Sequence, residues 1–213
     1  MKQRENYPAY YAVRDARRNG TRFLLLMLLV ALSIGGSVFA DGLHRMAEPY
    51  VSAHAADTLT VGTPGYRAFH WASKAATVGG TMRVSGWVLS WFAAAYAVSS
   101  VLNHETQSAA VLSALGVRQK TILSVMRREV LILIFPAVMT GFVGGFGVLR
   151  LYIRHLVADG TLPAALWKAQ SGFSSFLVLT AGILVTAAIP LFLIRIRLGG
   201  KSVGVLFREG ERE

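Results

Sequence analysis

Residue types that could do chemistry are sparse in this chain of 213 residues. There is no cysteine, which excludes disulfides and thiolate metal sites. There is also no Gly-x-x-x-x-Gly-Lys-Ser/Thr phosphate loop, the glycine-rich turn that holds nucleotide phosphates. We therefore expect no catalytic residue, no metal site and no cofactor in this chain.

One group of side chains has the right types for haem, because histidine, methionine and tyrosine can all serve as axial ligands of its iron. The group lies between residues 41 and 83 and consists of His44, Met46, Tyr50, His54, Tyr66 and His70. No diagnostic spacing joins these residues. Ordinary loop histidines are therefore the favoured interpretation.

Four apolar blocks dominate the sequence, in which 54% of residues are hydrophobic and 15% are charged. A soluble domain averages about 25% charged residues. Each block is free of Asp, Glu, Lys and Arg and is long enough to cross the hydrocarbon, which takes roughly 17–25 residues. The blocks are 23–40, 84–103, 130–149 and 169–194. Buried helices of a soluble core are the alternative, but so short a chain has too little polar sequence to cover such a core. We predict an all-α membrane protein with four transmembrane helices.

The distribution of basic residues predicts the orientation in the membrane. Of the 22 Lys and Arg residues, 15 lie before the first block, between the second and third blocks, or after the fourth. Such an excess marks the cytoplasmic side. We expect both termini in the cytoplasm of a bacterium, with the chain in its cell membrane. The net charge of +11 is then explained by anionic lipid headgroups, without nucleic acid.

A cleaved signal peptide is the alternative for the first block, since Val38-Phe39-Ala40 resembles a cleavage site. However, the block is longer than the usual apolar region of about 7–15 residues, and 22 residues precede it. We expect it to remain as the first transmembrane helix.

The remaining sequence divides around these blocks. Tyrosines and arginines in the first 22 residues predict an amphipathic interfacial helix, with a solvated basic tail as the alternative. A small extracytoplasmic segment should hold one or two helices or a hairpin, with a short strand near 58–61. The expected parts are 1–22 (amphipathic helix), 23–40 (first span), 41–83 (outer segment), 84–103 (second span), 104–128 (cytoplasmic loop), 129–151 (third span), 152–170 (outer loop), 171–195 (fourth span) and 196–213 (tail).

Glycines in the membrane helices predict close packing. Gly141 and Gly145 form a Gly-x-x-x-Gly face with Gly144 beside it, and Gly35-Gly36 lies in the first span. Small residues let two helix backbones approach. Glycines are common in membrane helices, so they indicate packing contacts and not a function.

The cytoplasmic loop contains a short amphipathic segment. Val111, Leu112 and Leu115 recur at helical spacing, and Gly116 suits the end of a helix. Such a helix could dock a soluble partner or simply pack on the membrane. The pattern alone leaves both readings open.

The same loop carries a family resemblance. Residues 105–119, ETQSAAVLSALGVRQ, resemble the Arg-Glu-(apolar)-x-Leu-Leu-Arg-Ala-Leu-Gly-Ala stretch of the FtsX/MacB-like permeases of ABC transporters, in the type VII-like superfamily. Glu129, the glycines of 141–147 and the basic stretch 12–19 also match. Gln107, Ser108 and Ser113 replace the family's Arg, Glu and Arg, and the outer segment is smaller than usual.

The resemblance implies a permease subunit that works with separate ATPases. Two ATPase subunits would bind ATP and Mg²⁺, and a second permease chain would complete a homodimer or heterodimer. The loop would be the coupling helix between the second and third spans, contacting an ATPase through Glu105, Val111, Leu112, Ala114, Leu115, Gly116, Arg118 and Lys120.

The resemblance leaves three roles open. The complex could export or extract a hydrophobic or amphipathic compound, or move its outer segment. The chain could instead be an FtsX-like transducer that regulates an extracytoplasmic partner such as a cell-wall hydrolase. It could also be the accessory half of a heterodimeric permease.

Overall fold

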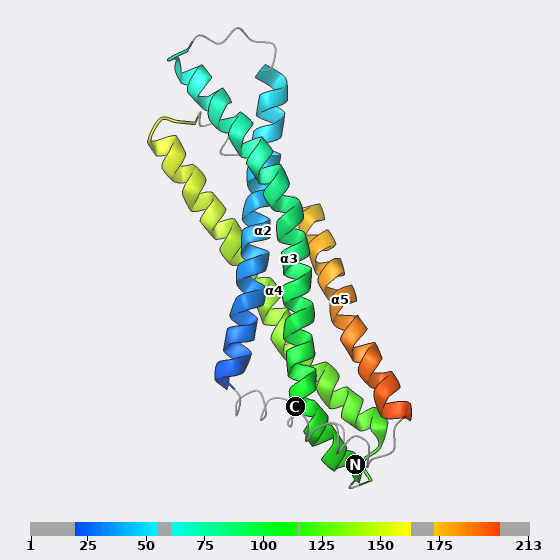
Figure 1. The fold of residues 1–213 in the computed structure, drawn as a ribbon. Helices are drawn as coiled ribbons and strands as arrows, with labels where there is room; N and C mark the ends of the chain where they lie inside the picture. The colour runs from blue at the N-terminus through cyan, green and yellow to red at the C-terminus, as the bar shows by residue number, and fades with distance from the viewer. Residues whose placement is uncertain (1–19, 55–60, 115, 163–172, 201–213) are drawn as a thin grey trace. The chain divides into compact units, whose positions relative to one another are not determined.

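The computed structural model describes residues 20–54, 61–114, 116–162 and 173–200, and their regular structure is entirely helical. All four helices are long and apolar enough to cross a membrane. They are α2 (Gly20–His54), α3 (Pro64–Ala114), α4 (Gln119–Ala158) and α5 (Phe173–Gly200), drawn in Figure 1. The predicted fold class, an all-α protein with four membrane-spanning helices, is confirmed, and no strand occurs within the described residues.

All four helices exceed the thickness of the hydrocarbon, and α2, α3 and α4 do so by more than the 28-residue α5. At 1.5 Å per residue, a helix of about 20 residues crosses roughly 30 Å. α2, α3 and α4 have 35, 51 and 40 residues. The membrane helices therefore continue into the connections that the sequence suggested were separate segments.

The described part of the region 41–83 is mainly helical. α2 continues to His54 and α3 starts at Pro64, so both ends of the region prolong membrane helices. The expected strand near 58–61 falls largely outside the described residues, and Val61 lies in a turn. The helix continues through Pro49, and Asp41 and Arg45 pair across one turn of it.

The first part of the expected cytoplasmic loop, 104–128, is continuous with the second span. Residues 104–114 are the last turns of α3, and no break divides them from the second span. The expected N-terminal amphipathic helix, the outer loop from residue 163 to 170 and the tail from residue 201 lie outside the described residues.

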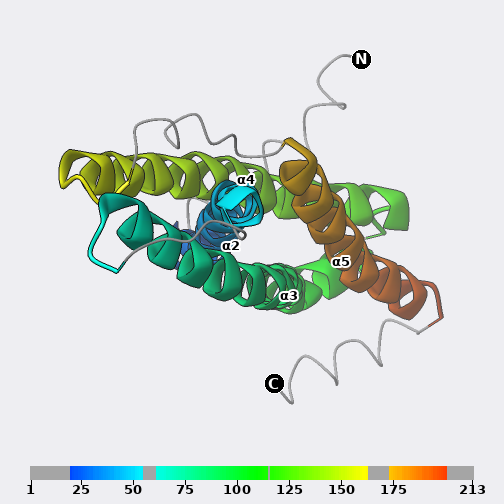
Figure 2. The same ribbon diagram turned by 90° about the horizontal axis from the view of Figure 1, so that it is seen from above.

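The chain divides into two compact units. The described part of the first unit comprises 20–30 of α2, 92–114 of α3, 119–137 of α4 and 182–200 of α5, and its buried side chains include Val30, Leu102, Met126, Leu133 and Ile183. The described part of the second unit comprises 31–54, 61–91, 138–162 and 173–181, and its buried side chains include Ile34, Val38, Met46, Leu149 and Ile153. In the second unit, α2 is seen end-on between α3 and α4 (Figure 2).

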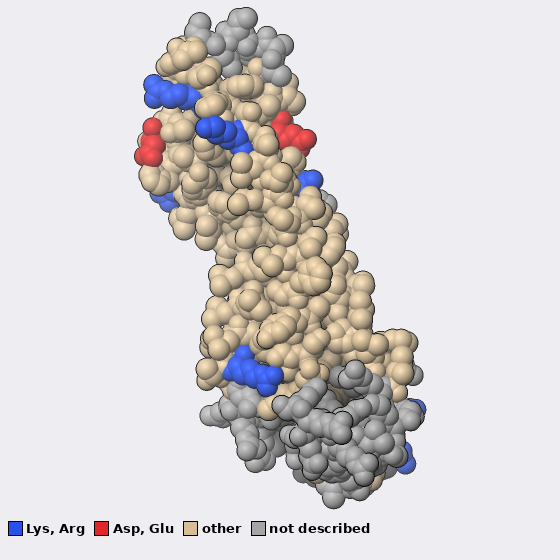
Figure 3. Space-filling model, viewed as in Figure 1, with Lys and Arg blue, Asp and Glu red and all other residues tan. Residues whose placement is uncertain are grey.

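Large apolar side chains remain exposed along every helix. Examples are Leu32 on α2, Phe92 on α3, Val143 on α4, and Val185 and Phe192 on α5. In Figure 3 the charged side chains gather toward helix ends, and the surface over the helix middles is uncharged. A soluble monomer rarely exposes so much apolar surface, whereas lipid is its natural solvent.

Candidate functional sites

The turn between α3 and α4 has the geometry of a glycine-capped helix end. Gly116 has a φ of +79°, a region that L-residues with a side chain rarely occupy. The Val117 N–H donates to the Leu112 carbonyl at 3.0 Å, which is the long-range bond of a Schellman cap. The Arg118 carbonyl then accepts from Thr121 N–H at 2.8 Å, and α4 begins. A single residue of left-handed backbone thus reverses the chain between two long helices.

This turn, in the first unit, carries the sequence-predicted docking residues. Val111 is 48% exposed, Leu112 is half-buried, and Gly116, Arg118 and Lys120 are exposed. Glu105 and Ala114 belong to α3, but their side chains are outside the description, as is the whole of Leu115. The described part of the turn therefore presents one apolar side chain and two cations.

The sequence did not predict the structural roles of two charged residues in the first unit. Arg22, counted only as a basic residue before the first span, donates to the Ser100 carbonyl and hydroxyl at 2.8 and 2.9 Å. This joins the start of α2 to α3. Glu129, noted only for its match to the family, is 1% exposed in the core of the unit. Nothing in the local sequence distinguishes Arg22 from its basic neighbours.

The second unit brings three of the five predicted packing glycines together. A β-carbon on Gly141 would lie 2.6 Å from the Ala31 carbonyl oxygen, and one on Gly145 would lie 2.8 Å from the Gly35 Cα. Gly35 and the Gly141/Gly145 face are therefore where α2 and α4 touch backbone to backbone. Gly36 and Gly144, also predicted, have open space where a β-carbon would stand.

A serine pair joins α2 to α3 in the same unit. The Ser37 and Ser90 hydroxyls lie 2.9 Å apart, and each is 2.8 Å from the carbonyl one turn earlier on its own helix, Ser33 and Gly86 respectively. Each hydroxyl has one proton. One serine therefore donates to the other, and the second donates to its own helix.

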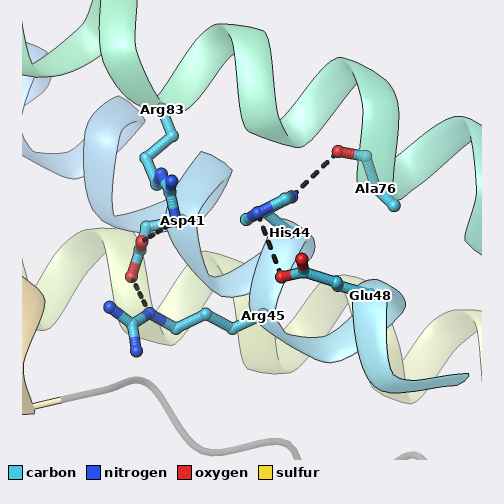
Figure 4. A network of polar contacts seen from close by, with 6 residues as sticks. All are labelled: Asp41, His44, Arg45, Glu48, Ala76 and Arg83. Carbon is cyan, nitrogen blue, oxygen red and sulfur yellow. Dashed lines mark hydrogen bonds and ion pairs between the residues drawn. The ribbon is translucent and has the colours of Figure 1, made fainter. Parts of the chain in front are cut away.

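Around Asp41 the second unit holds a polar cluster formed by α2 and α3 (Figure 4). The Asp41 side chain is 3% exposed, and its Oδ2 accepts from Arg45 Nε at 2.9 Å. Arg83 Nη1 of α3 lies 3.7 Å from Oδ1, close enough for an ion pair but too far for a hydrogen bond. The sequence offered a signal for Asp41 and Arg45, their spacing of four, but none for Arg83.

His44 completes this cluster. Its Nδ1 donates to the Ala76 carbonyl of α3 at 2.9 Å, and its Nε2 lies 3.3 Å from Glu48. Beside them, Gly79 lets α3 approach the His44 backbone, because a β-carbon there would stand 2.9 Å from the His44 nitrogen. The cluster therefore fixes α3 against α2 through charge, hydrogen bonds and close backbone contact.

The candidate haem ligands are engaged in local contacts. His54 Nδ1 contacts the Tyr50 carbonyl at 2.9 Å, and the two rings stack at 4.2 Å. Tyr66 and His70 stack at 6.0 Å, and Met46 lies in the core with Leu149 and Ile153. Within the described residues, no three His, Cys, Asp or Glu side chains are placed to hold a metal ion.

Helices of this length and composition define a multi-pass membrane protein. Residues 75–203, which include most of α3, the glycine-capped turn, α4 and α5, match the family model described as FtsX-like permease C-terminal. The match covers more than half of the chain, which therefore belongs to the FtsX-like permeases. No curated protein and no solved structure matches it.

Membership of this family defines the broad class of activity. FtsX-like permeases are membrane subunits of the ABC-transporter type. They act as transport or transducer components, are not themselves catalytic enzymes, and generally work with ABC ATPase partners. The resemblance noted in the sequence is thus confirmed at the level of the family.

Proposed function

We propose that this chain is a permease subunit that couples ATP hydrolysis by a separate ATPase to the movement of a hydrophobic or amphipathic compound. Two ATPase subunits, which bind ATP and Mg²⁺, act on a pair of permease chains. The observation that carries the proposal is the glycine-capped turn at Gly116, with Val111, Arg118 and Lys120 exposed around it.

The turn suits docking because it combines shape with chemistry. Gly116 lets the chain reverse in few residues, so only a short turn separates the end of α3 from the start of α4. Val111 offers an apolar anchor of the kind that contributes most to a protein interface when seated in a pocket. Arg118 and Lys120 supply charge that can steer and orient an acidic partner surface.

Continuity of α3 supports coupling over distance. The helix runs for 51 residues without an internal proline, whereas α2, α4 and α5 each contain one, at Pro49, Pro136 and Pro190. Proline removes a backbone hydrogen bond and kinks a helix. α3 therefore leaves the docking turn without the internal proline that each of the other three helices contains.

The short α2–α3 connection favours transport over regulation of an outer enzyme. Only residues 55–63 separate His54 from Pro64, which is too short for a folded docking domain. A transducer for a cell-wall hydrolase would need an extracytoplasmic surface to which the hydrolase could bind. The projecting helix ends offer less of such a surface than a folded domain would.

Copurification tests the proposal. The tagged chain is isolated from its native membrane, bound ATPase chains are identified, and ATP hydrolysis is measured. Val111→Asp should reduce ATPase recovery about tenfold or more, since it places a charge where an apolar contact is expected. Val61→Asp is the matched control, because Val61 is 82% exposed in the outer connection. Equal ATPase recovery with both variants would refute docking at this turn.

A further inference from the structure

Three buried hydrogen-bond donors lie along one stripe of α3 in the second unit. Arg83 Nε, Trp87 Nε1 and Trp91 Nε1 are each shielded from solvent and have no hydrogen-bond acceptor among the described residues. A spacing of four residues places them on one side of the helix, about 6 Å apart along its axis. Buried indole N–H groups usually find a partner. A stripe of three unsatisfied donors is therefore unusual and needs a physical reason.

The stripe lies next to the surface by which α3 contacts α2. Gly86 packs on Ser37, and Ser90 is hydrogen-bonded to the same residue. Trp87 and Trp91 each follow one of these contact residues and so lie at the edge of the contact face. Both indoles are half-buried, so part of each ring stays accessible to a ligand.

Arg83 has a long ion-pair contact in the cluster, to a carboxylate that a second arginine also holds. Asp41 is the only carboxylate paired with Arg83 among the described residues, and it already accepts a hydrogen bond from Arg45. Two guanidinium groups thus share one carboxylate. The Arg83 guanidinium also lies over the Trp87 ring, 5.5 Å from its centre, and the side chain stays 29% exposed.

The position of Arg83 along α3 indicates the kind of ligand. Arg83 immediately precedes the uncharged stretch 84–103, at the level where lipid headgroups meet hydrocarbon. Trp87 lies one turn deeper, the depth of the ester groups of a lipid, and Trp91 lies a further turn into the apolar region. The order along α3 is therefore a cation, then a hydrogen-bond donor, then an aromatic surface. An amphiphile has the matching order of charged head, polar linker and apolar chain.

We propose that Arg83, Trp87 and Trp91 form a binding site for an anionic amphiphile, with a phosphate or carboxylate head at Arg83 and an acyl chain along the two indoles. The head displaces the long Arg83–Asp41 contact and replaces it with charge-assisted hydrogen bonds. Movement of the guanidinium off the Trp87 ring uncovers that ring and its N–H for the linker. Binding of the amphiphile does not depend on docking of an ATPase, so the site can be tested separately from the proposed function.

Quenching of tryptophan fluorescence tests this site in the full chain. Trp71→Phe and Trp167→Phe leave Trp87 and Trp91 as the only tryptophans, because the chain has four, and they are excited at a wavelength that tyrosine does not absorb. The purified protein in detergent micelles is titrated with phosphatidylglycerol or phosphatidylcholine carrying the same brominated acyl chains. We expect the anionic lipid to quench at about five- to tenfold lower mole fraction.

Matched variants assign the preference to Arg83. Arg83→Gln should abolish the difference between the two lipids, whereas Arg83→Lys should keep part of it. Arg67→Gln is the control, since Arg67 is an exposed cation of the same helix that makes no ion pair with a described residue. Equal quenching by both lipids in the parent, or an unchanged preference in a helical Arg83→Gln protein, would overturn the site.

Asp41→Asn separates ligand binding from a purely structural ion pair. If Asp41 competes with the ligand for Arg83, its neutralisation should increase the preference for the anionic lipid. If the pair serves only to hold α2 and α3 together, Asp41→Asn and Arg83→Gln should impair the protein alike, and that result would refute the proposal. Loss of the preference on adding inorganic phosphate alone would identify a free-anion site and would also refute it.

Discussion

The backbone of Gly145 on α4 lies against the backbone of Gly35 on α2, so that a β-carbon on Gly145 would stand 2.8 Å from the Gly35 Cα. One turn away, a β-carbon on Gly141 would stand 3.1 Å from the Ala31 Cα, so the close contact extends over both glycines. Lipid tails are as apolar as leucine, and helices in a membrane are therefore held together by close packing more than by exclusion of water. This contact is where α2 and α4 can gain most from such packing.

Gly145→Leu and Gly141→Leu should therefore destabilise the protein. Forcing a bulky side chain into a filled contact costs about 1–3 kcal/mol, and more where backbone must shift. The measurement is thermal unfolding in detergent, followed by helical circular dichroism. Gly144→Leu is the control on the same helix, because nothing lies within 4 Å of a β-carbon there. If all three variants unfold at the same temperature, the α2–α4 contact is not as close as described.

The Ser37–Ser90 pair should show direct energetic coupling. Removing either hydroxyl leaves the other serine able to bond to its own helix, so single changes to alanine should cost little. Hydrogen bonds between membrane helices contribute about 0.6 kcal/mol on average. A double-mutant cycle of Ser37→Ala and Ser90→Ala, measured by unfolding in detergent, should give a coupling energy of that size. Strict additivity of the two changes would contradict the hydrogen bond.

For docking of the ATPase, the positive φ of Gly116 should matter more than the small size of the residue. The positive φ costs an ordinary L-residue about 1–2 kcal/mol, but asparagine tolerates it better. Gly116→Val should weaken ATPase copurification, whereas Gly116→Asn should retain most of it. Leu115→Asp, next to the turn, should also weaken it if Leu115 is an anchor. Full ATPase recovery with Gly116→Val would show that this backbone geometry is not needed for docking.

The orientation can be tested with introduced cysteines, because the chain has none of its own. Val61→Cys and Asp159→Cys lie in the two connections expected outside, and both positions are exposed. Lys120→Cys lies at the start of α4, expected in the cytoplasm by the excess of basic residues. A membrane-impermeant thiol reagent on intact cells should label positions 61 and 159 and spare 120. The opposite pattern would invert the topology.

Several features of the docking turn were predictable because they are local. Gly116 could be assigned to a helix end from its place after Val111 and Leu112, since a C-terminal glycine relieves strain whatever surrounds it. The continuity of α3 into this region was not predictable. The charged and polar residues after Asn103 end the apolar block, but they do not end a helix whose backbone bonds remain intact.

The sequence by itself determined the four membrane helices, because the free energy of placing some 20 apolar residues in lipid is a property of each segment alone. Only the tertiary structure decided that Gly35 and not Gly36 meets α4, and that Arg83 lies beside Asp41, 42 positions away in the chain. Such pairs depend on how far each helix is rotated and shifted against its neighbour. Many residues packed together set that rotation and shift, so no short stretch of sequence encodes them.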